Sequence, residues 1–116
     1  MNSEQPIGIF DSGIGGLTIA AAINKILPNE QIIYFGDTQH LPYGDKSNKK
    51  ILFYSDRIVD FLLKKKCKAI IIACNSASAI AYDFLEKKTL KKCLLFNVIS
   101  PLIKYIEKDV SIKNIG

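Results

Sequence analysis

The sequence contains few cysteines, and their arrangement excludes two common roles. Three are present among 116 residues: Cys67, Cys74 and Cys93. Three thiols at these spacings make neither a disulfide framework nor a metal-ligand motif. We therefore expect buried or functional thiols in a reducing compartment.

Long apolar runs are also missing from the sequence. No stretch approaches the roughly 18 apolar residues that a membrane-spanning helix requires. The first residues, MNSEQPIGIF, lack the basic start and apolar core of a signal peptide. These absences predict a cytoplasmic protein with no membrane partner.

Arginine is nearly absent, because Arg57 is the only one and the net charge of +5 comes almost entirely from lysine. That charge alone would suit a nucleic-acid binder. However, the lysines gather at expected helix ends, as at 64–66 and 87–88, and no aromatic residues interleave with them. A solvated lysine-rich surface explains the charge better, so no nucleic-acid partner is expected.

Short apolar runs alternate regularly with segments of helical periodicity. The expected strands are 7–10, 32–35, 68–73 and 94–98; the expected helices are 14–27, 49–66, 77–86 and 101–108, and a further strand begins at 111. This alternation predicts an α/β fold, a parallel β-sheet flanked by helices on both faces. Such sheets bind ligands at the carboxyl ends of their strands, so the strand-to-helix junctions are where a site is expected.

The first junction reads DSGIGG and begins at Asp11 and Ser12. Its glycines permit a tight turn and a close approach of the backbone to a ligand. A dinucleotide-binding loop would need a third glycine where Thr18 stands, although Asp37 could serve as its ribose-binding acid. Because Asp11 would repel a pyrophosphate, that reading is the weaker one. A simple tight turn with Asp11 as a helix cap is the other alternative.

The second junction is a polar loop over 37–48, which is long enough to indicate function. Pro42 stiffens this loop, and Gly44 can present its backbone N–H to a ligand. Asp37 could instead be a loop cap. His40, the only histidine, is on a polar loop and would more often be merely solvated, so no role is assigned to it.

The third junction places Cys74 between an apolar strand and a helix whose first residues include Asn75 and Ser76. The positive end of a helix stabilises a thiolate, which can act as a base or a nucleophile. A buried structural cysteine is the alternative, and it suits Cys67 and Cys93 better because neither follows a strand. Three candidate loops at one edge of the sheet favour a functional Cys74.

Three segments together resemble the motifs of bacterial glutamate racemases, within the aspartate/glutamate racemase superfamily. They are IFDSGIGGL at 9–17, YFGDTQHLPYG at 34–44 and ACNSASA at 73–79, and their order and spacing match as well. The resemblance implies interconversion of L- and D-glutamate without a cofactor, which supplies D-glutamate for peptidoglycan. In that chemistry one thiolate removes the Cα proton and a second thiol returns a proton from the opposite face.

Residue by residue, the resemblance makes Cys74 one of the two acid/bases. Asp11 and Ser12 would contact the substrate and the cysteine, and Asp37 would tune the site. The remaining substrate contacts that it implies are Pro42, Tyr43, Gly44, Asn75 and Ser76. Position 76 is usually threonine in the family; serine keeps the hydroxyl and loses a methyl group. A homodimer is also compatible with the resemblance.

The length departs from the family pattern, because the second cysteine of that pattern lies in a Cys-Thr-His motif that this sequence lacks. We therefore expect an N-terminal half, with 1–98 as an incomplete first domain and 99–116 as the start of a second. Such a chain should be inactive as a racemase when it is alone. A related aspartate racemase, another cysteine-dependent dicarboxylate isomerase and a non-catalytic binding module remain alternatives.

Overall fold

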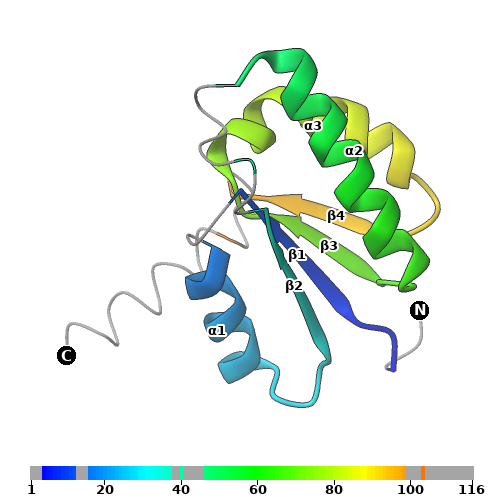
Figure 1. The fold of residues 1–116 in the computed structure, drawn as a ribbon. Helices are drawn as coiled ribbons and strands as arrows, with labels where there is room; N and C mark the ends of the chain where they lie inside the picture. Colours follow the sequence, from blue (N-terminus) through cyan, green and yellow to red (C-terminus); the bar gives the residue numbers. More distant parts are fainter. Residues whose placement is uncertain (1–3, 13–15, 38–39, 41–45, 99–102, 104–116) are drawn as a thin grey trace.

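Four short strands form a parallel sheet at the centre of the molecule. The structure is a computed structural model that describes residues 4–12, 16–37, 40, 46–98 and 103. The strands lie in the order β2-β1-β3-β4 and all pair in parallel (Figure 1). Their bounds are β1 (Ile7–Asp11), β2 (Ile32–Gly36), β3 (Ala69–Ile72) and β4 (Leu94–Asn97). The α/β class and the parallel sheet predicted from the sequence are therefore confirmed.

Helices cover both faces of this sheet, which explains why its central strands are almost wholly apolar. The helix α1 (Gly16–Ile26) packs on one face, where Ile9 and Ile71 are buried (Figure 1). The helices α2 (Asn48–Lys64) and α3 (Asn75–Thr89) pack together on the other face. None of the helices in the described residues combines the length and apolar character needed to cross a membrane.

The helix boundaries differ from those predicted, and local hydrogen bonds explain the differences. The helix expected over 77–86 begins at Asn75, because Cys74 caps it, and it continues to Thr89. The Thr89 hydroxyl donates to the Leu85 carbonyl oxygen at 2.9 Å, a bond that suits a helical turn. The helix expected to reach residue 66 ends at Lys64, and Lys66 adopts a φ of 62° in the turn that follows. The segments expected at 101–108 and 111–116 lie outside the described residues, apart from Ile103.

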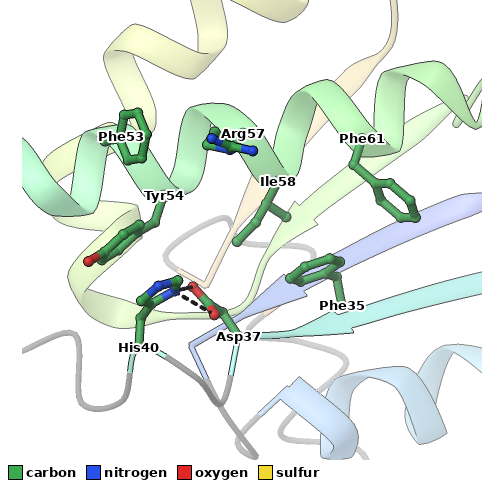
Figure 2. A pocket seen from close by; sticks show the side chains of 8 residues that line it. All are labelled: Phe35, Asp37, His40, Phe53, Tyr54, Arg57, Ile58 and Phe61. Carbon is green, nitrogen blue, oxygen red and sulfur yellow. Dashed lines mark hydrogen bonds and ion pairs between the residues drawn. The ribbon is translucent and has the colours of Figure 1, made fainter.

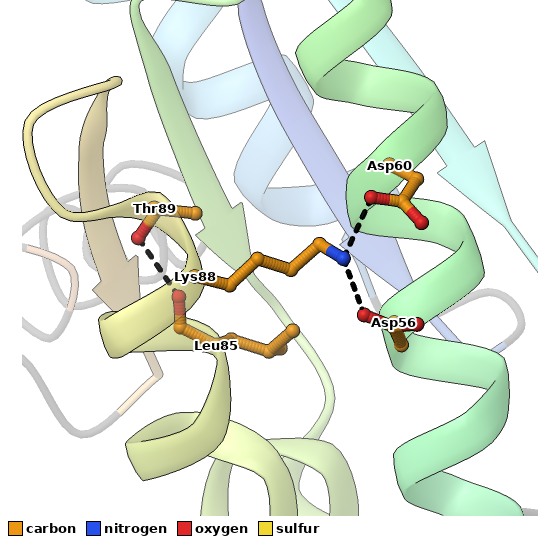
Figure 3. Close-up of polar contacts among 5 residues, drawn as sticks. All are labelled: Asp56, Asp60, Leu85, Lys88 and Thr89. Carbon is orange, nitrogen blue, oxygen red and sulfur yellow. Dashed lines mark hydrogen bonds and ion pairs between the residues drawn. The ribbon is translucent and has the colours of Figure 1, made fainter.

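An ion-pair cluster joins α2 to α3 on the outer side of this layer. The Lys88 ammonium lies 2.5 Å from an Asp56 carboxylate oxygen and 2.6 Å from one of Asp60 (Figure 3). Partial burial lowers the pKa of Lys88, but the hydrogen bonds to Asp56 and Asp60 outweigh it, so the pKa is raised above its ordinary value. The two helices that flank the candidate site are thus connected by charge as well as by apolar packing.

Candidate active site

The ends of three strands bring polar side chains together at one edge of the sheet. Asp11 ends β1, Asp37 directly follows β2, and Cys74 follows β3 after one residue. Backbone hydrogen bonds continue the pairing past the strands: Asp37 N–H donates to the Asp11 carbonyl at 2.8 Å, and Ala73 N–H to the Phe10 carbonyl at 2.7 Å. The predicted convergence of the three junctions is therefore found at the carboxyl edge of the parallel strands.

Asp11 is almost fully buried, and its carboxylate accepts hydrogen bonds from Ser12 and Tyr34. One oxygen accepts from the Ser12 backbone N–H at 2.8 Å, and the other accepts from the Tyr34 hydroxyl at 3.3 Å. Burial, together with the charge of Asp11 and this hydrogen bond, raises the pKa of Tyr34 to about 12. Tyr34 is therefore a neutral donor at physiological pH. Sequence reasoning missed it, because the contact joins neighbouring strands and no local pattern indicates it.

Asp37 is buried and pairs with His40. The His40 Nδ1 atom lies 2.9 Å from one carboxylate oxygen of Asp37 and 2.8 Å from the other. The prediction that this histidine would be merely solvated is wrong: its side chain is 33% exposed, and its ring stacks on Tyr54 of α2 (Figure 2). The spacing of an acid and a histidine three residues apart could have indicated the pair.

Cys74 is the N-cap of α3. Its backbone is extended, with φ −103° and ψ 128°, and its sulfur accepts from the Ala77 N–H at 3.5 Å. A helix N-terminus presents free N–H groups and the positive end of the helix dipole, so it favours an anion such as a thiolate. The Ser78 hydroxyl supports the junction by donating to the Ile72 carbonyl at 3.2 Å.

The other predicted contact residues divide into two groups. Ser12 lies directly after β1, and Asn75 and Ser76 lie in the first turn of α3, so all three are at the same edge as Cys74. Pro42, Tyr43 and Gly44 lie outside the described residues. Among the residues that are described, no group of three or more histidines, cysteines and acids is arranged to hold a metal ion.

The other two thiols lie at the opposite edge of the sheet. Cys67 precedes β3 and Cys93 directly precedes β4, whereas Cys74 follows a strand. Burial, reinforced by the nearby Cys93, raises the pKa of Cys67 to about 11. Burial also raises the pKa of Cys93, an effect that Lys92 partly offsets.

We predict that Cys74 is the thiol that reacts first with an alkylating reagent at neutral pH. Because the thiolate is the reacting species, the raised pKa values of Cys67 and Cys93 should slow both of those thiols. Limiting iodoacetamide followed by peptide mass spectrometry should find the label mainly on Cys74. Labelling of the more exposed Cys93 ahead of Cys74 would contradict this expectation.

Comparison with known proteins agrees with the resemblance to glutamate racemases that the three sequence motifs indicate. No family model matches the chain. A glutamate racemase from Chlorobaculum tepidum is 52% identical over 87 residues, which are 75% of this chain and 32% of that protein. Glutamate racemase from Thermus thermophilus, in complex with β-chloro-D-alanine, matches with a TM-score of 0.80 at 40% identity, covering 87% of this chain and 39% of that one. The Francisella tularensis glutamate racemase in complex with D-glutamate matches with a TM-score of 0.77 at 48% identity, and the match covers 84% of this chain and 37% of that one.

The fold and the capping cysteine, taken with these matches, make the chain a relative of the amino-acid racemases. Within that class its relatives in both sequence and structure are glutamate racemases. The chain spans about a third of the length of the curated relatives that it matches, which fits the N-terminal part of those proteins.

Proposed function

We propose that this chain provides one half of the active site of a cofactor-independent glutamate racemase, with Cys74 as one of its two acid/bases. The observation that carries the proposal is the position of Cys74. It caps α3 at the same edge of the sheet as the buried carboxylates of Asp11 and Asp37. The likeness to a racemase in complex with D-glutamate supports glutamate as the substrate. Supply of D-glutamate for peptidoglycan is the role we propose for the whole protein.

The proposed step is a proton transfer at Cα of the amino acid. The Cys74 thiolate takes the proton from one face, and the electron pair left on carbon delocalises into the adjacent carboxylate. Donation of a proton to the opposite face inverts the centre, whereas its return from Cys74 restores the original configuration. A positioned acid/base typically accelerates such a transfer by roughly 10²–10⁴-fold.

The remaining residues of the site would bind and orient the substrate. We propose that Ser12, Asn75 and Ser76 contact its α-substituents, since all three lie at the same edge of the sheet as Cys74. Asp11 would contact the substrate's amino group and the cysteine, and Asp37 would tune the electrostatics of the edge. We also propose that Pro42, Tyr43 and Gly44 contact a carboxylate of the substrate, and only the resemblance of the segment at 34–44 supports this.

Inversion needs a second donor on the far side of the substrate, and neither other thiol of the chain is placed to provide it. Cys67 and Cys93 lie at the amino ends of β3 and β4, across the sheet from Cys74. We therefore expect the 116-residue chain, tested alone, to exchange the Cα proton of glutamate with retention of configuration and to form no appreciable amount of the other enantiomer.

One incubation tests both parts of this expectation. L-glutamate or D-glutamate is incubated with the chain in D₂O; proton NMR follows loss of the Cα–H signal, and chiral chromatography follows configuration. Exchange with retention supports the proposal, and the absence of exchange above a protein-free control contradicts it.

The same measurement with aspartate distinguishes the alternatives. Faster exchange of aspartate than of glutamate would favour the aspartate racemase alternative. Saturable glutamate binding without exchange would favour the non-catalytic binding module. Formation of the opposite enantiomer would overturn the need for a donor outside this chain.

A further inference from the structure

The pairing of His40 with Asp37 is more specific than a surface contact. An ionised carboxylate can only accept hydrogen bonds, so Nδ1 is the nitrogen of His40 that would carry the proton and donate it to ionised Asp37. Nδ1 is within 2.9 Å of both carboxylate oxygens, and the His40 backbone N–H approaches the Asp37 carbonyl at 3.4 Å. The imidazole therefore lies directly against the carboxylate of the residue three positions before it.

The His40 ring is held from its other side by α2. Its centroid lies 3.8 Å from that of the Tyr54 ring, and the two planes are inclined by 13° (Figure 2). Tyr54 in turn belongs to a helix fixed by buried residues such as Ile51 and Ile58. Stacking on a fixed ring restricts the imidazole to a narrow range of orientations, and so restricts the direction in which Nδ1–H points.

The surroundings of the pair strengthen this hydrogen bond. Asp37 and His40 line one end of a cavity of about 440 Å³ between β2 and α2, and Phe35, Phe53 and Phe61 supply apolar walls (Figure 2). Asp37 is itself tied to the end of β1 through its backbone N–H, and its side chain is 8% exposed. A hydrogen bond to a charged group that is itself buried, as the Asp37 side chain is, is stronger than the same bond in water.

We infer that His40 is a positioning residue for the candidate site: clamped by Tyr54, it fixes the direction of the buried Asp37 carboxylate at the strand ends. The catalytic consequence of this inference rests on the proposed function, in which Asp37 tunes the site of proton transfer. The hydrogen bond and its dependence on Asp37 can be measured without any activity.

The first experiment determines which nitrogen of His40 carries the proton. A long-range ¹H–¹⁵N spectrum of the neutral imidazole distinguishes the Nδ1–H tautomer from the Nε2–H tautomer, which is the commoner form in free histidine. The wild-type chain should show Nδ1–H, and the Asp37→Ala variant should shift towards Nε2–H. A wild-type ring in the Nε2–H form would overturn the inference, whether or not the chain has activity.

The second experiment compares two variants of His40, one of which keeps the stacked ring and the other the hydrogen-bond donor. His40→Phe retains a flat ring against Tyr54 but has no donor, and His40→Asn retains an N–H near the position of Nδ1 but has no ring. A small misplacement of a group in an active site lowers the reaction rate. Because His40→Phe no longer orients Asp37, it should lower the saturated rate of Cα exchange by about tenfold. The glutamate concentration that gives half of that rate should change little, and His40→Asn should recover most of the loss.

The outcomes separate this inference from the proposed function. Exchange by His40→Phe at the wild-type rate would overturn the positioning role while leaving the proposed function intact. If the wild-type chain catalyses no exchange, the proposed function fails, and the tautomer alone decides whether His40 holds the carboxylate. Thermal unfolding of each variant identifies losses of activity that come from instability rather than from misplacement.

Discussion

Replacement of Cys74 by serine is expected to remove nearly all catalysed Cα exchange while leaving the chain folded. Serine is a good N-cap, so its hydroxyl can accept the Ala77 N–H that the sulfur accepts now. A hydroxyl is a far weaker acid than a thiol, so its conjugate base is scarcely populated at neutral pH. The rate of deuterium incorporation into glutamate should fall by roughly 10²–10⁴-fold, the range that a positioned base typically contributes.

Three further variants complete the test. Cys74→Ala should lose the exchange as well and should also lose about 0.5–2 kcal/mol of stability, because alanine cannot cap the helix. Cys67→Ala and Cys93→Ala are the matched controls, since each removes a thiol from the opposite edge of the sheet. Retention of exchange by Cys74→Ser would show that another group is the base. Loss of exchange in Cys67→Ala or Cys93→Ala would indicate that a thiol at the amino ends of the strands takes part in the reaction.

Substitution of valine for Gly8 is expected to destabilise the fold strongly. Gly8 lies in β1 beneath α2, and a Cβ atom there would come within 3.0 Å of the Cys67 sulfur and 3.1 Å of a Leu62 methyl group. Leu62 is fully buried, so it has little room to move. Overpacking of this kind typically costs about 1–3 kcal/mol, a large share of the roughly 5–15 kcal/mol that keeps a domain folded.

Urea denaturation of Gly8→Val and of the double variant Gly8→Val/Cys67→Ala measures this crowding. Removal of the Cys67 sulfur takes away the nearest of the clashing atoms, so the double variant should recover part of the lost stability. Residues in contact usually show such coupling, whereas distant pairs give additive changes. A Gly8→Val variant as stable as the wild type would show that α2 can move away from the sheet at little cost.

Most of the fold could be predicted from sequence periodicity because the order of strands and helices follows the pattern of hydrophobic burial. The runs at 7–10 and 32–35 become strands, and the order of strands and helices follows the alternation. The edge at which Asp11, Asp37 and Cys74 meet could also be predicted, since parallel strands all point the same way. These properties depend on the average character of whole segments and hence survive errors of a residue or two at each boundary.

Contacts between particular side chains were much harder to predict. The start of α3 was misplaced because a cysteine cap has no strong statistical signature, although its sulfur is a competent acceptor here. The stacking of His40 on Tyr54 joins residues fourteen positions apart whose neighbourhood depends on how α2 crosses β2. Tyr34 reaches Asp11 only because β2 lies beside β1. Each of these contacts depends on tertiary geometry that local patterns do not encode.

The bond between the Cys74 sulfur and the Ala77 N–H makes one backbone amide a reporter of charge at the site. A thiolate accepts a hydrogen bond more strongly than a thiol does, so the amide proton of Ala77 should resonate further downfield whenever the sulfur is ionised. One peak in an ordinary ¹H–¹⁵N correlation spectrum would then follow the protonation of the proposed base directly. Alkylation of the sulfur should move the same peak in the opposite direction, which would allow chemical modification of the site to be followed by NMR.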